Sequence, residues 1–398
     1  NSIFDNLDIK GIPSGGQSRH FHLESSAFNT IRGSQIYGGE GNATNQGYGI
    51  FVGYSTSNNL IENNIFRQTI LGLAFEGATS GNVVAYNYTT QSRWFDDGVN
   101  RLMIINHGGG SRNLIEGNVI EGRYREDDYF ASGNSTAIFR NRIEQMKRDE
   151  RGGTIAYQVQ TIDLEQFHRN FSIIGNVLGT ANYETVYEHS GVDGADDAIK
   201  TIYRLGYSDP YDSTAGVNRY CEDDACTRWY DEANDPKVKA TLIRHGNWDS
   251  VTARSGSTCP TGSTCSNGVV WSNSIADRAI PPSLYLDSKP AWFGTMQWPA
   301  YGPDPSNPNV LLNGKIPAQV RFEGGTVIIG PTYTLSASKS GNGTITGGGL
   351  SCGNTCSAQT SGSVTLTATP DLTSTFAGWG GACLARGTNP TCTVNVTA

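Results

Sequence analysis

Charged side chains that could do chemistry gather in one stretch of the sequence, from residue 93 to residue 128. Arg93-Trp-Phe-Asp-Asp97 and Arg123-Tyr-Arg-Glu-Asp-Asp128 each place arginine close to paired aspartates, and His107 lies between the two runs. Carboxylates and imidazole can transfer protons in general acid–base catalysis, carboxylates can bind Ca²⁺, and arginine binds the carboxylate of a substrate. We call this stretch the charged patch and treat it as the candidate site.

The charged patch separates into two groups of candidate residues by their chemistry. The candidate catalytic acids and bases are Asp96, Asp97, His107, Asp127 and Asp128, and the candidate substrate-binding residues are Arg93, Arg123 and Arg125. The alternative is that these charges form solvated ion pairs in long loops, and that His107, which precedes a run of glycines, is a turn residue. His168 and His189 are predicted to be structural rather than catalytic.

A repeating pattern on both sides of the charged patch indicates which elements carry it. An apolar residue is followed by two variable residues, an Asn and usually another apolar residue, as in Ile115-Glu-Gly-Asn118-Val. Further copies end on Asn64, Asn87, Asn141 and Asn176, with a degenerate copy at Ser34 and a late copy at Asn273. Successive steps from Asn64 to Asn176 are 23, 31, 23 and 35 residues, so we infer a repeat with loops inserted into some copies.

The apolar runs are short, alternating and rich in β-branched residues, which predicts strands rather than helices. A strand, a bend and a return describe one turn of a parallel β-solenoid, in which equivalent positions stack about 4.8 Å apart. Asn tolerates left-handed backbone at a bend and carries donors and an acceptor, so stacked Asn side chains can bond to one another. We therefore predict that Asn118 is an interior-facing member of an Asn ladder. Because His107 and Asp127 are separated by about one turn, we expect them on one face.

With this repeat, residues 15 to 290 resemble the right-handed parallel β-helix proteins of the pectate-lyase-like superfamily. The resemblance implies an all-β chain whose main domain is a right-handed parallel β-helix, or solenoid. The resemblance does not identify an activity, because lyases, hydrolases, epimerases, tailspikes and adhesins share this fold. The pectate-lyase run Arg-x-Pro-x-x-Arg and the polygalacturonase motifs are absent from the sequence, and Trp94-Phe-Asp-Asp-Gly98 matches only the paired Asp of the latter.

Composition divides the chain into a long domain and a small one. The expected β-helix covers 1–301, with an acidic, cysteine-containing insertion at 191–266 and a C-terminal tail that covers its end. Within the insertion, Pro236 at a first-turn position, followed by apolar residues at helical spacing, predicts a short helix. The prolines of 302–332 predict a stiff linker, which leads to a small β-domain at 333–398.

The small domain shows strand-like alternation in Tyr333–Ser338 and in residues 363–370. Together with Phe376-Ala-Gly-Trp379 and two cysteine pairs, these runs resemble the bacterial InlB-like β-repeat module. That resemblance implies a spacer or binding unit of secreted and cell-surface bacterial proteins, without chemistry of its own.

Eight cysteines form four close pairs, Cys221/Cys226, Cys259/Cys265, Cys352/Cys356 and Cys383/Cys392. Their unequal spacings, with Gly, Ser and Thr around them and no His beside them, favour four local disulfides over a metal site. Disulfides persist in oxidising compartments, which predicts an extracellular or bacterial cell-surface location. Ca²⁺ is the candidate cofactor, for which the acidic insertion offers carboxylates but no regular Asp-x-Asp-x-Asp-Gly loop.

Charge and hydropathy narrow the function classes. Acids outnumber bases by 37 to 29 without a visible basic stripe, which argues against nucleic acid as the main partner, and no apolar run is long enough for a membrane span. The chain begins at Asn1 and stops inside a strand-like run, as expected for a fragment or a processed chain. Two functions remain. The first is a secreted or cell-surface β-helix that binds or processes polysaccharide, as a lyase or glycoside hydrolase. The second is a non-catalytic adhesin or subunit of an extracellular filament, whose partners would be glycans or copies of itself.

Overall fold

The computed structural model divides the chain into two compact units, which are described one at a time. The first unit comprises Asn1–Ile280 and Pro299–Glu323, and the second comprises Pro281–Trp298 and Gly324–Ala398. The structure describes residues 2–12, 18–39, 47–69, 71–91, 102–106, 108–128, 131–144, 159–189, 199–207, 219–221, 229–231, 235–327, 333–348, 350–353, 355–360 and 362–396.

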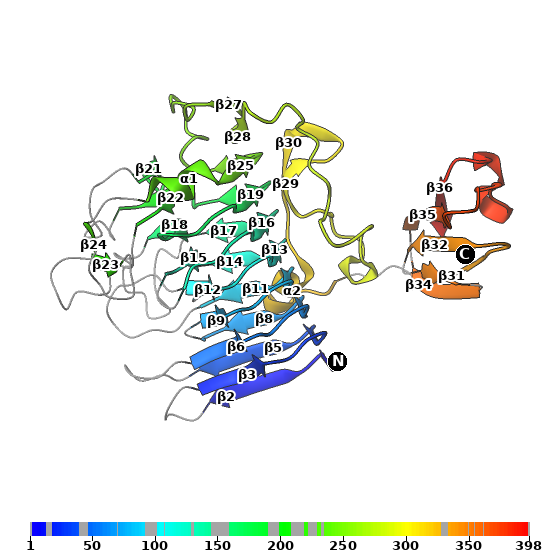
Figure 1. Cartoon of the computed structure of the whole chain (residues 1–398), viewed down its shortest axis with the longest axis horizontal. Helices are drawn as coiled ribbons and strands as arrows, with labels where there is room; N and C mark the ends of the chain where they lie inside the picture. The colour runs from blue at the N-terminus through cyan, green and yellow to red at the C-terminus, as the bar shows by residue number, and fades with distance from the viewer. Residues whose placement is uncertain are drawn as a thin grey trace. The chain divides into compact units, whose positions relative to one another are not determined.

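The first unit is built mainly from three β-sheets with parallel strands (Figure 1). The first sheet has the order β1 (Ile3–Asp5), β4 (Thr30–Arg32), β7 (Leu60–Glu62), β10 (Val83–Ala85), β13 (Leu114–Glu116), β16 (Ala137–Phe139), β19 (Ser172–Ile174) and β25 (Ile243–His245). The second sheet has the order β2 (Asp8–Ile12), β5 (Gln35–Gly39), β8 (Ile65–Arg67), β11 (Tyr88–Thr90), β14 (Val119–Glu121), β17 (Arg142–Glu144), β20 (Val177–Leu178) and β26 (Asn247–Asp249), followed by the antiparallel strands β28 (Val269–Ser272) and β27 (Ser263–Ser266). The third sheet has the order β3 (Ser18–Glu24), β6 (Gly47–Gly53), β9 (Leu71–Glu76), β12 (Leu102–Asn106), β15 (Arg123–Glu126), β18 (Gln160–Leu164), β22 (Thr201–Leu205) and β21 (Val186–Glu188). From β1 to β21 the strands enter the three sheets in rotation, so each pass of the chain adds one strand to each sheet.

One apolar core contains side chains from all three sheets. The register of the first sheet aligns one row of aliphatic residues, at most 1% exposed: Ile31, Ile61, Val84, Ile115, Ile138 and Ile173. β-Branched side chains fit the pleated surface of a strand, and full burial of each contributes about 1.5–3 kcal/mol. The alternation in the sequence therefore predicted these strands for the right physical reason.

The predicted Asn ladder follows the bends between the first and second sheets. Asn118 is fully buried; its Nδ2 donates to Asn141 Oδ1 and to Val84 O, each at 2.9 Å, while its Oδ1 accepts from the backbone N–H of Asn87 at 2.9 Å. The same bonds recur along the row Asn64, Asn87, Asn118, Asn141, Asn176 and Asn247. At the degenerate copy, the backbone N–H of Ser34 donates to Asn64 Oδ1 at 3.0 Å. The prediction for Asn118 is confirmed.

The left-handed backbone at each bend belongs to the residue before the ladder position, not to the ladder Asn itself. The residues in question have φ between 50° and 69°: Gly33, Asn63, Tyr86, Gly117, Arg140, Gly175 and Gly246. Glycine adopts this conformation without a steric penalty, whereas side-chain-bearing residues adopt it at a cost. The ladder Asn thus stabilises the bend by bonding across passes, and the neighbouring residue makes the turn.

A second Asn ladder, which sequence analysis missed, lies just before the strands of the first sheet. Asn59 Nδ2 donates to Asn82 Oδ1 at 2.9 Å, and Asn82 Nδ2 donates to Asn113 Oδ1 at 3.0 Å. Asn29 begins the row by donating to Asn59 Oδ1 at 3.0 Å. A signal was present in the sequence, because each of these Asn residues stands two positions before a member of the buried aliphatic row.

The last passes of the first unit differ from the expected arrangement. The next ladder member after Asn176 is Asn247, which accepts from Asn176 Nδ2 at 2.9 Å, whereas Asn273 is exposed. The expected late copy at Asn273 is therefore wrong, because β28 pairs antiparallel with β26. The segment expected as an insertion, 191–266, contributes β22, β25 and β26 to the parallel sheets; Arg244 replaces the apolar residue in Ile243-Arg-His-Gly-Asn247 and hides that copy.

Two smaller elements of the same segment complete this part of the fold. The predicted short helix is α1 (Pro236–Ala240), where Asp235 accepts a bond from the backbone N–H of Lys237. Strands β23 (Arg219–Cys221) and β24 (Trp229–Asp231) form a separate antiparallel pair.

Residues 299–323, which we call the C-terminal strap, belong to the first unit. The strap contains the antiparallel hairpin of β29 (Tyr301–Asp304) and β30 (Asn307–Asn313) and the helix α2 (Pro317–Phe322), all within or next to the segment expected to be a linker. Arg140 Nη1 donates to Tyr301 O at 2.7 Å, and Arg321 Nη1 donates to Asn63 Oδ1 at 2.8 Å. Since Arg140 and Asn63 lie at bends between the first and second sheets, the strap covers those bends, and α2 lies beside β8 (Figure 1).

The second unit contains the short 3₁₀ helix η3 (Ala291–Phe293) and an antiparallel β-domain. The strands of the β-domain are β31 (Tyr333–Ser338) paired with β34 (Thr355–Thr360), and the sheet β33 (Leu350–Cys352), β32 (Gly343–Gly347), β35 (Gly362–Pro370) and β36 (Thr391–Val396), with the 3₁₀ helix η4 (Gly381–Arg386). The core of this β-domain combines aliphatic side chains with Cys352, Cys383 and Cys392.

Disulfides join three of the predicted cysteine pairs. They are Cys259–Cys265 in the first unit and Cys352–Cys356 and Cys383–Cys392 in the second. Cys226 lies outside the described residues, so its pairing with Cys221 stays a prediction.

Candidate functional site

Half of the candidate residues of the charged patch lie in strand β15 or directly after it. Arg123 and Arg125 belong to β15, and Asp127 and Asp128 follow it. The remaining candidates lie outside the described residues: Arg93, Asp96, Asp97 and His107.

The arginines of β15 point away from the core. Tyr124 pairs with Ile162 of β18, and both are core residues. The next residue, Arg125, pairs with Asp163, which in turn pairs with Arg204 of β22. Because side chains alternate between the two faces of a strand, Arg125, Asp163 and Arg204 form one row on the outer face of the third sheet.

Five charged side chains of this outer face form what we call the arginine–carboxylate cluster, namely Arg123, Arg125, Asp163, Glu165 and Arg204. Asp163 accepts from Arg123 Nη1 at 3.2 Å through Oδ2 and from Arg204 Nη1 at 3.0 Å through Oδ1. Arg125 Nε donates to Glu165 Oε1 at 2.7 Å. All five residues are at most 5% exposed. Removal of one partner would leave a buried charge uncompensated, which is strongly destabilising.

The two described arginines that were predicted to bind substrate therefore bind carboxylates of the chain itself. Asp128 is tied to the same cluster, since its backbone N–H donates to Glu165 Oε2 at 3.1 Å. Asp127 and Asp128 are 1% and 7% exposed. In this arrangement a polysaccharide could reach these groups only if the residues around them moved.

Sequence analysis missed Asp163, Glu165 and Arg204 as partners of the patch. A signal was present, because Thr161-Ile-Asp-Leu-Glu165 alternates polar and apolar residues, and Arg204 stands between the core residues Tyr203 and Leu205. That alternation indicates that these charges share a face, but it does not say which arginine each carboxylate meets.

The ends of β12 and β15 lie side by side. Their last residues, Asn106 and Glu126, are paired, so Asp127 leaves the third sheet next to the end of β12. His107 follows Asn106 in the sequence but lies outside the described residues. The expected common face of His107 and Asp127 thus stays a prediction.

His168 lies in the interior and not at an accessible site. Its Nδ1 is 3.1 Å from the carbonyl oxygens of Glu165 and Gln166, so Nδ1 carries the proton, and its Nε2 is 3.7 Å from Glu126 Oε2. Burial lowers the pKa of His168 to about 4, so the imidazole is neutral at neutral pH. His189, which is also buried, packs edge-on against Tyr207 with ring centroids 4.8 Å apart.

Two further buried carboxylates lie in the last passes of the first unit. Asp249 pairs with the core residue Leu178 and accepts bonds from the backbone N–H groups of Val251 at 3.0 Å and Thr252 at 2.7 Å. Burial raises the pKa of Asp249 to about 6. Burial also raises the pKa of Glu184. At 1% and 0% exposure both carboxyl groups are closed to substrate, although the raised pKa of Asp249 would suit proton transfer.

No group of three or more His, Cys, Asp or Glu side chains in the described part of the chain is arranged to hold a metal ion. Across the same residues, the structure contains no helix with the length and apolar character needed to cross a membrane.

Comparison with known proteins assigns no class to the chain. No protein-family model matches it, and neither a curated protein nor a solved structure matches it significantly.

Proposed function

We propose that the chain is a right-handed parallel β-helix protein of the pectate-lyase-like superfamily with an InlB-like β-repeat domain, and that it acts as a non-catalytic adhesin on the bacterial surface. The rotation of strands through three parallel sheets supports the β-helix, as does the Asn ladder at equivalent bends. The three disulfides support an extracellular location, because thiols are kept reduced in the cytosol.

The observation that carries the non-catalytic assignment is the internal pairing of Arg123 and Arg125, the two arginines of the charged patch that the structure describes. A catalytic acid or base must come within hydrogen-bond reach of the substrate, and a substrate-binding arginine must present its guanidinium to it. Arg123 and Arg125 instead donate to the buried carboxylates of Asp163 and Glu165. This arrangement favours a structural role, in which the arginine–carboxylate cluster fixes three adjacent passes to one another.

A second candidate function, polysaccharide cleavage, is favoured by one observation. β12 and β15 end side by side, which would bring residues after β12 close to Asp127 and Asp128. If these aspartates were catalytic, replacing either by Asn would lower the rate by about a hundredfold or more.

The test compares binding with cleavage on the same polysaccharides. We expect the full chain to be retained by at least one polymer among polygalacturonate, alginate, xylan and cellulose, without release of reducing ends or of unsaturated uronic acids. Release of products that is lost in Asp127→Asn or Asp128→Asn, with the fold preserved by circular dichroism, would replace the adhesin with an enzyme.

A further inference from the structure

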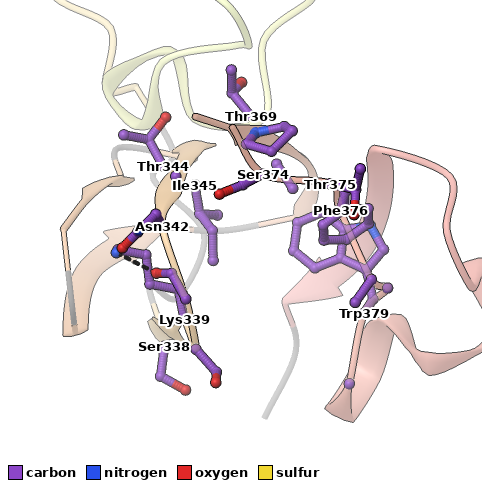
Figure 2. A pocket seen from close by; sticks show the side chains of 18 residues that line it. Ser338, Lys339, Asn342, Thr344, Ile345, Thr369, Ser374, Thr375, Phe376 and Trp379 are labelled. Carbon is purple, nitrogen blue, oxygen red and sulfur yellow. Dashed lines mark hydrogen bonds between the residues drawn. The ribbon is translucent and has the colours of Figure 1, made fainter. Parts of the chain in front are cut away.

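The antiparallel β-domain of the second unit contains a cavity of about 650 Å³ that the proposed function has not used. It lies between the turn after β31, the strands β32 and β35, and the segment 374–380. Figure 2 shows Asn342 and Lys339 on one side of the cavity and Phe376 and Trp379 across from them. A cavity of this size suits a small ligand or one or two units of a polymer.

The aromatic side of the cavity is held in place before any ligand arrives. Phe376 and Trp379 meet edge to face, with ring centroids 5.2 Å apart and an angle of 69° between the rings. Trp379 Nε1 donates to Asn389 O at 2.8 Å, and the indole packs against the core of the domain. Both rings are half-buried, so each keeps some surface to offer to a ligand. Rings fixed in this way bind apolar faces at a low entropic cost.

The remaining walls of the cavity carry uncommitted polar groups. The side chains of Asn342, Thr344, Thr369, Ser374 and Thr375 line the cavity and, among the described residues, make no hydrogen bonds to the rest of the chain. Hydroxyl and amide groups both donate and accept hydrogen bonds. Such groups opposite aromatic rings complement a molecule with apolar C–H faces and a rim of hydroxyls.

The charge of the lining limits the ligand further. Among the described residues, the lining contains no carboxylate, and its one charged side chain is Lys339, whose Nζ donates to Gly341 O at 2.8 Å. A cationic ligand would therefore meet no opposite charge, whereas a neutral or an anionic ligand is accommodated.

We propose that this cavity binds a pyranose ring of a glycan chain, with Phe376 and Trp379 against the C–H face of the sugar and the Thr, Ser and Asn side chains bonded to its hydroxyls. Neutral sugars and uronic acids share the pyranose ring that the cavity would recognise. The carboxylate of a uronic acid would form an ion pair with Lys339. This inference rests on the proposed adhesive role and gives it a binding site outside the charged patch.

The experiment is isothermal titration calorimetry of the full chain with cellohexaose, xylohexaose, chitohexaose and hexagalacturonate as probes. We expect at least one probe to bind, and Phe376→Ala to weaken that binding by about tenfold. Phe376→Tyr keeps the ring and should bind as the wild type does. Leu384→Ala is the matched control, because Leu384 is a 69% exposed apolar residue of η4 that does not line the cavity.

Lys339→Gln separates the two kinds of sugar. Loss of affinity for hexagalacturonate alone, together with weaker binding of this probe to the wild type at high salt, identifies a uronic acid. Unchanged affinity for a neutral probe identifies a neutral pyranose. No binding of any probe, or equal affinity of Phe376→Ala and wild type with the fold preserved by near-ultraviolet circular dichroism, overturns the proposal. If the wild type cleaved a polysaccharide and Asp127→Asn did not, the non-catalytic adhesive role would be refuted. The test of this cavity would be unaffected.

Discussion

At the scale of single residues, hydrogen bonds of Asn side chains connect successive passes of the first unit. Asn118, for example, donates through Nδ2 to Asn141 of the next pass and accepts two bonds from Asn87 of the previous pass through Oδ1, so one side chain satisfies buried backbone groups as well as its own. Near one end of the row, the shorter side chain of Ser34 donates to Arg32 O, and the bond to the next pass is made by the backbone N–H of Ser34, which donates to Asn64 Oδ1 at 3.0 Å. Asn is favoured here because its donors and acceptor stand on one short, planar group.

We expect Asn118→Ala to lower the free energy of unfolding by about 1–3 kcal/mol, because it leaves Val84 O and the backbone N–H of Asn87 buried without their partner. Urea-unfolding midpoints of the variant and the wild type measure this loss. Asn273→Ala is the control, since Asn273 is exposed and outside the ladder, and it should change stability by less than about 0.5 kcal/mol. Equal losses in the two variants would contradict the ladder.

Asp249 should make the stability of the first unit depend on pH. Its folded pKa of about 6 lies above the ordinary value of 3.8, so the folded state favours the protonated carboxyl. The resulting stabilisation is complete below pH 3.8 and disappears as the pH rises through about 6. As the pH rises from 3.8 to about 6, we expect the unfolding free energy of the wild type to fall relative to that of Asp249→Asn. A difference that does not change with pH, measured by urea unfolding, would rule this out.

At the scale of elements, the C-terminal strap depends on one buried arginine. Arg140, which is 1% exposed, donates to Tyr301 O, Pro303 O and Ile280 O at 2.7, 2.9 and 2.9 Å. Burial lowers the pKa of Arg140 to about 10, which still leaves it charged at neutral pH. A Cβ on Gly302 would come within 2.0 Å of Gly175 O, so the hairpin lies directly on the backbone of a bend. Only a planar guanidinium reaches three carbonyls in this geometry.

We expect Arg140→Lys to destabilise the strap by about 1–3 kcal/mol, since an ammonium keeps the charge but cannot reproduce the fork of donors. Limited proteolysis followed by mass spectrometry should then show faster cleavage within 299–323. The matched variant is Arg142→Lys, whose side chain is 25% exposed and pairs with Glu144, so its effect should be small. Identical cleavage rates for Arg140→Lys and wild type would show that the strap is held by other contacts.

At the scale of the whole molecule, the two units stabilise themselves in different ways. The first buries continuous aliphatic rows and bonds each pass to the next through Asn side chains, so its stability is spread over many equivalent contacts. The β-domain of the second unit is small and places three disulfide-bonded cysteines in its core, as expected where apolar area alone is limited. This division suits the proposed adhesin, in which the parallel sheets of the first unit and the proposed glycan site of the second belong to separate units.

The sequence alone predicted the features that arise within one repeat. Alternating β-branched residues specified the strands, the Asn spacing specified the ladder, and close cysteine pairs specified three local disulfides, because each depends on neighbours in the chain or on an identical position one pass away. It missed the copy at Asn247, where Arg244 breaks the local pattern, and expected the late copy at Asn273. It also took the strap for a linker, because a proline-rich segment does not reveal what it packs against.

The tertiary structure alone decided what the charged residues do. Asp163 lies 40 residues from Arg123 and 41 from Arg204, and only the stacking of β15, β18 and β22 brings them together. Their burial likewise depends on the folded chain around them, which no local pattern encodes. The sequence therefore shows where the charges of the patch lie along the chain. The register of the third sheet determines that the described arginines pair with the chain's own carboxylates.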